Sequence, residues 1–201
     1  MDLLSRLVVA FDRWQRHRLG IWAFSDDPAC ILRLGFTTAR IEAELADGMV
    51  VRPGETIGVI HLWNERMPQI PPAGPDLAWA RKLKQALVHS LRLLARYTVE
   101  TPTLADIRAF GGELSLAYTP AAVRLLCRLG LEVFDQVPPH GLTERTRDLI
   151  ARLWTWLLRR TFNPESVRGL RMGDLQRRPV WLSRHTLIAL YGPGDSTTSG
   201  R

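Results

Sequence analysis

The residues best suited to chemistry in this sequence are His61, Asn64 and Glu65, which come together where an apolar run ends. Turn-forming pairs with glycine precede this run, so residues 56–62 are predicted to form a strand that delivers the three polar side chains to one short segment. His61 or Glu65 could act there as a general base. A histidine at a strand end is equally compatible with a hydrogen-bonded packing role, and the segment alone does not decide between the two.

Several arginines are candidates for binding an anionic group. Residues 77–97 have the apolar spacing of a helix, and this helix contains no acidic residue. A solvated helix face usually mixes charges, so the basic stripe with Arg81 and Arg92 favours an anionic contact. Arg108 is a further candidate for holding an anionic substrate group, whereas Arg81 could instead form a salt bridge with Glu65.

The composition limits the kind of protein that this chain can be. With 201 residues, 46% of them hydrophobic, the chain can bury one core, so residues 1–191 are predicted to form a single domain. Cys30 and Cys127 lack the spacing of a disulfide framework or a zinc site, and no metal site is predicted. The formal net charge of +7 indicates an acidic partner: a nucleic acid, an anionic membrane surface or an acidic protein.

Residues 1–20 are predicted to form an amphipathic helix, because leucines and aromatic residues recur there at helical spacing between arginines. Such a helix can dock on the core, or it can lie in a membrane interface with its aromatic residues as anchors. No apolar run is long enough to span a membrane, and the start lacks a signal-peptide cleavage site. A cytoplasmic location, with the option of peripheral attachment to the inner membrane face, is therefore expected.

The central part of the chain, residues 30–136, alternates short strands with helices. Helices are expected from residues 77 and 120, and strands at 31–34, 39–45, 50–51, 107–110 and 131–135. Turn signals between the early strands predict hairpins. The expected fold class is α+β, with a mainly antiparallel sheet packed by helices.

Residues 143–191 are predicted to be a basic, helical C-terminal part. A long helix is expected at about 143–161, and a last helix should begin after Ser183, an N-cap residue, and end near Tyr191. Arg184 follows that cap and is another candidate for contact with an anion. Residues 192–201 are predicted to be disordered.

No specific catalytic or cofactor motif is present. The sequence lacks nucleophile-elbow, dinucleotide-binding, P-loop and zinc-protease patterns, and its five histidines are scattered. It also lacks zinc-finger and RNP-type patterns, so a nucleic-acid partner is disfavoured although the charge would permit one. No cofactor is predicted, and these patterns leave open whether the protein is an enzyme.

Four segments, which together span most of residues 30–191, resemble the YkoP-like family. They read DGMVVRPGETIGVIHLWNER, LAWARKLKQALVHSLRLLARY, RLGLEVFD and VRGLRMGDLQRRPVWLSRHTLIALYG. That family comprises poorly characterised bacterial proteins, and similar domains occur fused to polysaccharide deacetylases or are encoded near envelope-modifying enzymes. Its recurring positions have no assigned catalytic role, and in this sequence they correspond to His61, Asn64, Arg81, Trp181, Ser183 and Arg184.

A weaker resemblance is to the GNAT acyltransferases. The segment PAAVRLLCRLGLEVFD is similar to the closing half of that fold, where a helix passes through a Leu-Gly turn into a strand. The pyrophosphate-binding loop of that family should precede the long helix, but PPAGPDLAWARK stands there instead. Without the backbone amides of that loop an acyl-CoA pyrophosphate lacks its cradle, and the resemblance reflects fold more than activity.

Three functional hypotheses result from these observations. The first is an accessory protein at the cytoplasmic membrane face that supports envelope polysaccharide or glycolipid modification, with an anionic membrane surface or an enzyme of the polysaccharide deacetylase type as its partner. The second is a GNAT-like acyltransferase that uses acyl-CoA, with His61 or Glu65 as base and Arg81 or Arg108 holding the substrate anion. The third is a nucleic-acid binder.

Overall fold

The structure is a computed structural model that describes residues 2–40, 42–115, 120–135, 141–172, 175 and 177–193. Its strands are β1 (Leu32–Thr38), β2 (Ala43–Glu44), β3 (Val50–Val51), β4 (Thr56–Leu62), β5 (Ala109–Ser115), β6 (Glu132–Val133) and β7 (Arg177–Ser183). The helices are α1 (Leu3–Arg18), α2 (Leu77–Glu100), α3 (Pro120–Arg128), α4 (Gly141–Phe162) and α5 (Arg184–Tyr191). Three short 3₁₀ helices join them: η1 (Asn64–Arg66), η2 (Pro102–Leu104) and η3 (Pro164–Val167).

The main sheet has five strands in the order β1-β4-β5-β7-β6, and β2 pairs with β3 in a separate small sheet. All neighbours in the main sheet are antiparallel except β4 and β5, which run parallel. The crossover between these two parallel strands is made by α2, as parallel pairing requires a long connection. The predicted class, α+β with a mainly antiparallel sheet, is confirmed.

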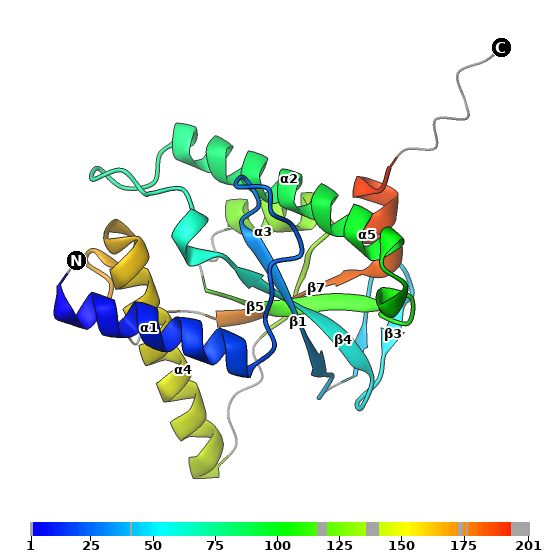
Figure 1. The fold of residues 1–201 in the computed structure, drawn as a ribbon, viewed down its shortest axis with the longest axis horizontal. Coiled ribbons are helices and arrows are strands. Elements are labelled where there is room, and N and C mark those ends of the chain that lie inside the picture. Colours follow the sequence, from blue (N-terminus) through cyan, green and yellow to red (C-terminus); the bar gives the residue numbers. More distant parts are fainter. Residues whose placement is uncertain are drawn as a thin grey trace.

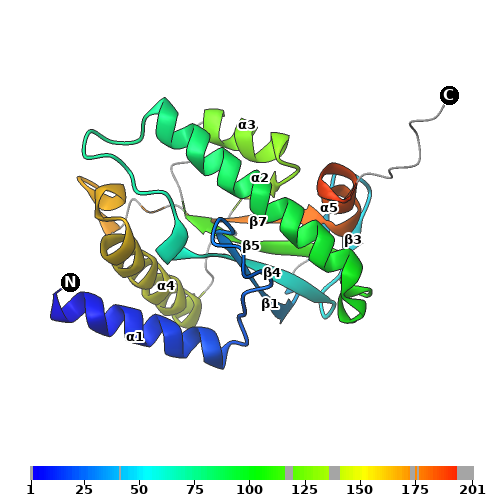
Figure 2. The same ribbon diagram turned by 45° about the horizontal axis from the view of Figure 1, so that its top comes forward.

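One face of the sheet is covered by α2, α3 and α5, as Figures 1 and 2 show. Side chains alternate between the two faces of a strand, so Leu32, Leu34, Phe110 and Leu182 point into this layer and form the main core with the helices. From α2 the main core takes Leu91, Leu94 and Ala95, all of which are buried. This layer fixes the positions of β1, β4, β5 and β7 relative to one another.

The opposite face of the sheet is covered by two separate groups of elements. Over part of it, the small sheet packs with Ile57, Ala109 and Trp181 in a second apolar cluster. The rest lies under α1 and α4, which pass close to each other on this side (Figure 2). An edge-on contact between the rings of Phe11 and Trp154, with 5.0 Å between the ring centroids, joins the two helices.

The C-terminal part contains a strand that was not predicted, because residues 177–183 form β7 between β5 and β6. Alternate residues of β7 face the two apolar layers: Val180 and Leu182 join the main core, and Trp181 joins the second cluster. A strand buried on both faces lacks the alternation of apolar and polar residues that marks a half-exposed strand. The four arginines and one proline around it concealed it further.

Other predicted elements agree with the structure in position and differ in length. Asp76 and Ser183 are N-caps as predicted; their side chains accept hydrogen bonds from the amides of Trp79 and Thr186. The strand predicted at 39–45 is only Ala43–Glu44, because Ala39 bonds to the loop before β4 and Leu45 already belongs to the turn. The tail after residue 193 lies outside the described residues.

We expect Gly58→Ala to destabilise the fold strongly. A Cβ atom at Gly58 would lie 2.4 Å from the Phe110 ring, which is fully buried in the main core and has no room to move. Overpacking of this kind costs about 1–3 kcal/mol of unfolding free energy. Urea denaturation of the variant checks this value.

Gly35→Ala is the matched control, because a Cβ atom there meets its nearest neighbour, Cγ1 of Ile21, at 3.4 Å, an ordinary contact. It should unfold at nearly the urea concentration of the unmodified protein. If Gly58→Ala and Gly35→Ala lose equal amounts of unfolding free energy, the close contact between Gly58 and Phe110 is not what destabilises the first variant.

Candidate functional site

A cavity lies between the second face of the sheet and helices α1 and α4. Its volume is about 900 Å³, and its lining comes from α1, β1, β4, β5, α4 and β7. Ligand sites in proteins are usually concave, largely apolar clefts with a few polar groups, and their volumes are about 300–1,000 Å³. We call this cavity the α1–α4 cleft and treat it as the candidate site.

His61 lines the α1–α4 cleft from near the end of β4. In the antiparallel pairing of β1 with β4 it lies opposite Arg33, and Gly35 leaves room for its ring, since a Cβ atom there would be 3.7 Å from the ring Nε2. Burial lowers the pKa of His61 to about 4. The imidazole is therefore neutral at physiological pH, with one nitrogen to donate and one to accept a hydrogen bond. Within the described residues neither nitrogen has a hydrogen-bond partner.

Arg33 is the most deeply buried arginine of the described residues, with 7% of its surface exposed. Its guanidinium lies 3.9 Å from the centre of the Trp63 ring, and Arg66 stacks on the same ring at 3.4 Å. The backbone carbonyls of Asp27 and Cys30 hold Arg66 in place through hydrogen bonds of 2.7 and 3.2 Å. This stack fixes the chain as it leaves β4, next to His61.

Glu65 connects α1 to the sheet through two ion pairs. Its Oε1 lies 3.1 Å from Arg16 and 3.6 Å from Arg33, and Arg16 also contacts the buried carboxylate of Asp12 at 2.9 Å. Burial raises the pKa of Asp12, an effect that Arg16 opposes and Glu65 reinforces. Two carboxylates and two guanidiniums thus balance each other at the junction of α1 with the sheet.

The structure brings together some of the predicted site residues and separates others. His61 and Asn64 line the α1–α4 cleft, and Glu65 is bound to two arginines at its edge. The other four predicted residues lie outside this cleft. Arg81 and Arg92 are exposed on α2, and Arg108 and Arg184 line a second cavity.

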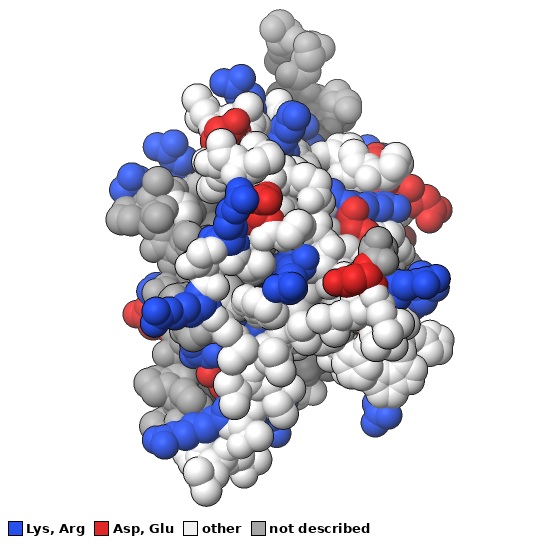
Figure 3. All heavy atoms as spheres, turned by 90° about the vertical axis from the view of Figure 1, so that its left-hand side faces the viewer, with Lys and Arg blue, Asp and Glu red and all other residues white. Residues whose placement is uncertain are grey.

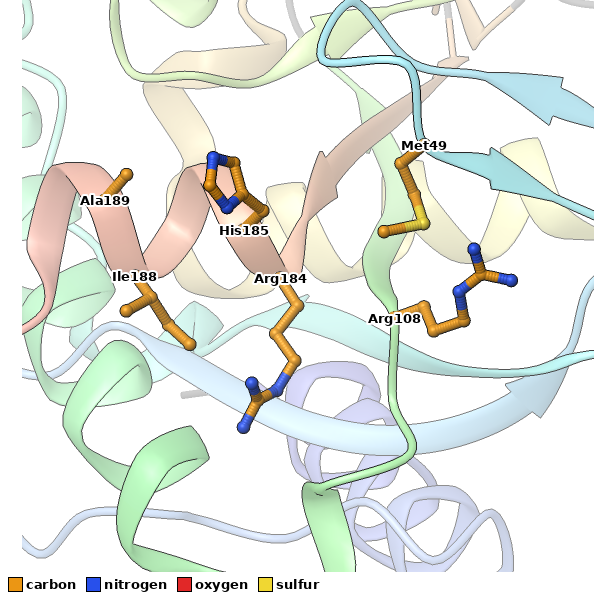
Figure 4. A pocket seen from close by; sticks show the side chains of 6 residues that line it. All are labelled: Met49, Arg108, Arg184, His185, Ile188 and Ala189. Carbon is orange, nitrogen blue, oxygen red and sulfur yellow. The ribbon is translucent and has the colours of Figure 1, made fainter.

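The second cavity is smaller, about 380 Å³, and lies where the end of β7 meets α5 (Figure 4). Arg108 is paired there with Glu55 at 3.5 Å, and Arg184 donates to the carbonyl of Thr98 at 3.3 Å. The remaining lining is mostly apolar, including Met49 and Ile188. Arg108 is thus neutralised by a carboxylate, whereas the buried Nε of Arg184 has no hydrogen-bond partner among the described residues. With one neutralised arginine and less than half the volume of the α1–α4 cleft, this cavity is the weaker candidate for a ligand site.

Sequence reasoning missed Arg33, Asp12 and Arg159, all of which line the α1–α4 cleft. For Arg33 the sequence contained a usable indication, because a single arginine interrupts the apolar run from Ile31 to Leu34. Asp12 and Arg159 looked like ordinary polar positions of amphipathic helices. Only the packing of α1 and α4 on the sheet reveals that they face a cavity.

The N-terminus of α2 already holds a carboxylate. The Asp76 side chain accepts a hydrogen bond of 2.7 Å from the amide of Trp79, so an acidic group occupies the amides that a pyrophosphate would use. This agrees with the absence of the acyltransferase pyrophosphate loop from the sequence. An acyl-CoA ligand would have to bind without that cradle.

A family model described as the YkoP domain matches residues 29–191. The chain belongs to the YkoP family. Neither the curated proteins nor the solved structures contain a match, so the weaker likeness to acyltransferases gains no support from known structures. The match to the YkoP domain begins after α1, yet α1 supplies Phe11, Asp12, Gln15 and Arg16 to the cleft, and its C-cap residue Leu19 also lines it.

In the described part of the chain, no set of three or more histidine, cysteine, aspartate or glutamate side chains is arranged to hold a metal ion. None of the helices described for this YkoP protein combines the length and the apolar character that a membrane span requires.

We expect His61 to make the YkoP protein less stable in mild acid. The folded protein resists protonation of this ring until about pH 4, whereas the unfolded chain binds the proton near pH 6.5. The unfolded state therefore gains protons first, and unfolding free energy falls as the pH drops through this interval. His61→Gln should remove this part of the pH dependence in urea titrations at several pH values.

The matched control is His17→Gln, because His17 is exposed on α1 and should leave the pH dependence unchanged. If the unfolding free energy of His61→Gln depends on pH as that of the unmodified protein does, the ring is not held neutral in the folded protein.

Proposed function

We propose that this YkoP protein is an accessory factor that binds peripherally to an anionic membrane surface at the cytoplasmic face, where it supports polysaccharide or glycolipid modification of the cell envelope. The observation that carries this proposal is the exposed apolar surface of α1 and α4. Both helices expose large side chains to solvent: Leu3, Leu4, Leu7, Phe11 and Trp14 on α1, and Leu142, Leu149, Ile150 and Leu153 on α4. Contiguous apolar patches of this kind mark protein or membrane contacts.

Basic side chains surround this apolar surface. Arg6, Arg13, Arg18, Arg145 and Arg147 are exposed on the same two helices. Figure 3 shows the side of the molecule on which α1 and α4 lie, with a broad uncharged area bordered mainly by lysine and arginine. Apolar residues that enter the lipid headgroup layer and arginines that meet anionic lipids are the two parts of an interfacial helix. Each basic residue near such a surface contributes about 1 kcal/mol of binding free energy.

The link to envelope chemistry rests on the family. This chain belongs to the YkoP family. The family resemblance implies the link, because similar domains occur fused to polysaccharide deacetylases or are encoded near envelope-modifying enzymes. An accessory role fits the site better than general-base catalysis. Glu65 is held by two guanidiniums, and His61 has no hydrogen-bond partner in the described residues that would orient it as a base.

We expect the double variant Leu3→Glu, Leu142→Glu to lose binding to vesicles that contain anionic lipid. These leucines are 73% and 82% exposed, so the fold should tolerate the change, while two buried charges oppose insertion into the headgroup layer. The unmodified protein should co-sediment with phosphatidylglycerol vesicles at low salt and dissociate as the salt concentration rises.

Leu77→Glu is the matched control, because Leu77 is 77% exposed at the start of α2, a helix that covers the opposite face of the sheet from α1 and α4 (Figure 2). It should bind vesicles as the unmodified protein does. Failure of the unmodified protein to bind anionic vesicles at low salt would rule out the membrane-surface role.

A further inference from the structure

The α1–α4 cleft has a long apolar part. Trp154 and Leu157 of α4 face Val59 of β4 and Trp181 of β7 across it, and Ile21 closes it beside β1. Most of these side chains offer no hydrogen bond. They favour a hydrocarbon chain, which gains about 0.8 kcal/mol for each methylene group taken out of water.

One end of the cleft is polar because several strands end or begin there. Parallel β4 and β5 finish at the same edge of the sheet, and β7 begins there because it runs antiparallel to β5. His61 and Ser115 therefore stand at the same edge, and both line the cleft. The Ser115 hydroxyl is buried, and no hydrogen-bond partner for it exists in the described residues. Buried hydroxyls are nearly always hydrogen-bonded, so this group is suited to a ligand.

Arg159 provides positive charge without a matching carboxylate. Its Nε and Nη2 donate to Oγ and to the carbonyl of Ser166 at 3.1 and 2.9 Å. A guanidinium has five N–H donors, so further donors remain on this half-buried side chain. By contrast, Arg177, which also lines the cleft, is paired with Glu113 and lies 4.0 Å from Asp148.

The charges that line the whole cleft are unequal. Six arginines line it. Arg16 and Arg33 are balanced by Asp12 and Glu65, and Arg177 is paired with Glu113, so the surplus comes from Arg40, Arg147 and Arg159. Arg40 and Arg147 are exposed, and in the described residues neither has an ion-pair partner. His61 is neutral and adds no charge of its own. An anion entering this space meets a surplus of positive charge in a region that is partly shielded from water, where electrostatic attraction is strong.

We infer that the α1–α4 cleft binds an amphiphile with one anionic head group, a phosphate or a carboxylate, and a single hydrocarbon chain. Arg159, His61 and Ser115 bind the head group, and the chain lies between α4 and the face of the sheet. Both helices that wall the cleft also carry the proposed membrane-binding surface, so a lipid can reach the cleft from that surface. Only this route of entry rests on the proposed function; the site itself does not.

The test uses dodecyl phosphate below its micellar concentration, with binding followed by tryptophan fluorescence, to which Trp154 and Trp181 in the cleft lining contribute. Dodecanol lacks the charge and inorganic phosphate lacks the chain, so each should bind at least tenfold more weakly. Lengthening the chain from eight carbons should tighten binding by roughly fourfold per methylene group until the cleft is full. Dodecanol binding as tightly as dodecyl phosphate would overturn the proposal.

Two variants locate the site. Arg159→Gln should weaken dodecyl phosphate binding at least tenfold. Arg160 is the next residue, is exposed and does not line the cleft. Arg160→Gln should therefore leave the affinity for dodecyl phosphate unchanged. Equal affinities in the two variants would contradict the role of Arg159. If Arg159→Gln unfolds, Ala151→Trp tests the same site by filling the cleft, and undiminished binding in that variant would overturn the assignment.

The source of the amphiphile is tested separately. Lysophosphatidylglycerol, which has one chain and a phosphate head group, identifies a membrane lipid as the source if it displaces dodecyl phosphate. If it leaves dodecyl phosphate bound, the source is a free amphiphile. The Leu3→Glu, Leu142→Glu variant keeps the cleft and should still bind dodecyl phosphate. If the unmodified protein binds dodecyl phosphate but does not bind vesicles, the membrane role is rejected and the cleft site remains.

Discussion

The close approach of β4 to β5 is the constraint on which the rest of the structure depends. Gly58 lies against the Phe110 ring, and a Cβ atom at Gly112 would be 2.6 Å from the carbonyl oxygen of Ile60. Only glycine allows two parallel strands and a buried aromatic ring to meet in this way. This contact places the ends of β4 and β5 at one edge of the sheet. His61 and Ser115 therefore face the same cleft.

The charges around the cleft are arranged so that most of them neutralise one another. Asp12 and Glu65 balance Arg16 and Arg33 where α1 meets the sheet. Exposed ion pairs contribute little to stability, but Asp12 and Arg33 are buried, and loss of either partner would leave a charge without compensation. Because α1 lies outside the matched YkoP domain, these pairs attach an added helix to the family's common fold and complete one wall of the cleft.

Local features of the fold could be predicted from the sequence, and long-range features could not. The strand at 56–62 and the caps at Asp76 and Ser183 depend on neighbouring residues, and the structure confirms them. The position of β7 between β5 and β6 depends on contacts far along the chain, and its continuous burial hides the strand pattern. For the same reason Arg108 and Arg184 looked equivalent to residues near His61, although they line another cavity.

The α1–α4 cleft, and not the smaller cavity or the basic face of α2, is inferred to be the ligand-binding site. The most direct measurement of this is a ¹H–¹⁵N NMR titration of the arginine and histidine side chains with dodecyl phosphate. We expect shifts for the Arg159 and His61 resonances and none for Arg108, Arg184, Arg81 or Arg92. Shifts confined to these last four arginines, or no shifts at saturating dodecyl phosphate, would contradict binding in the cleft.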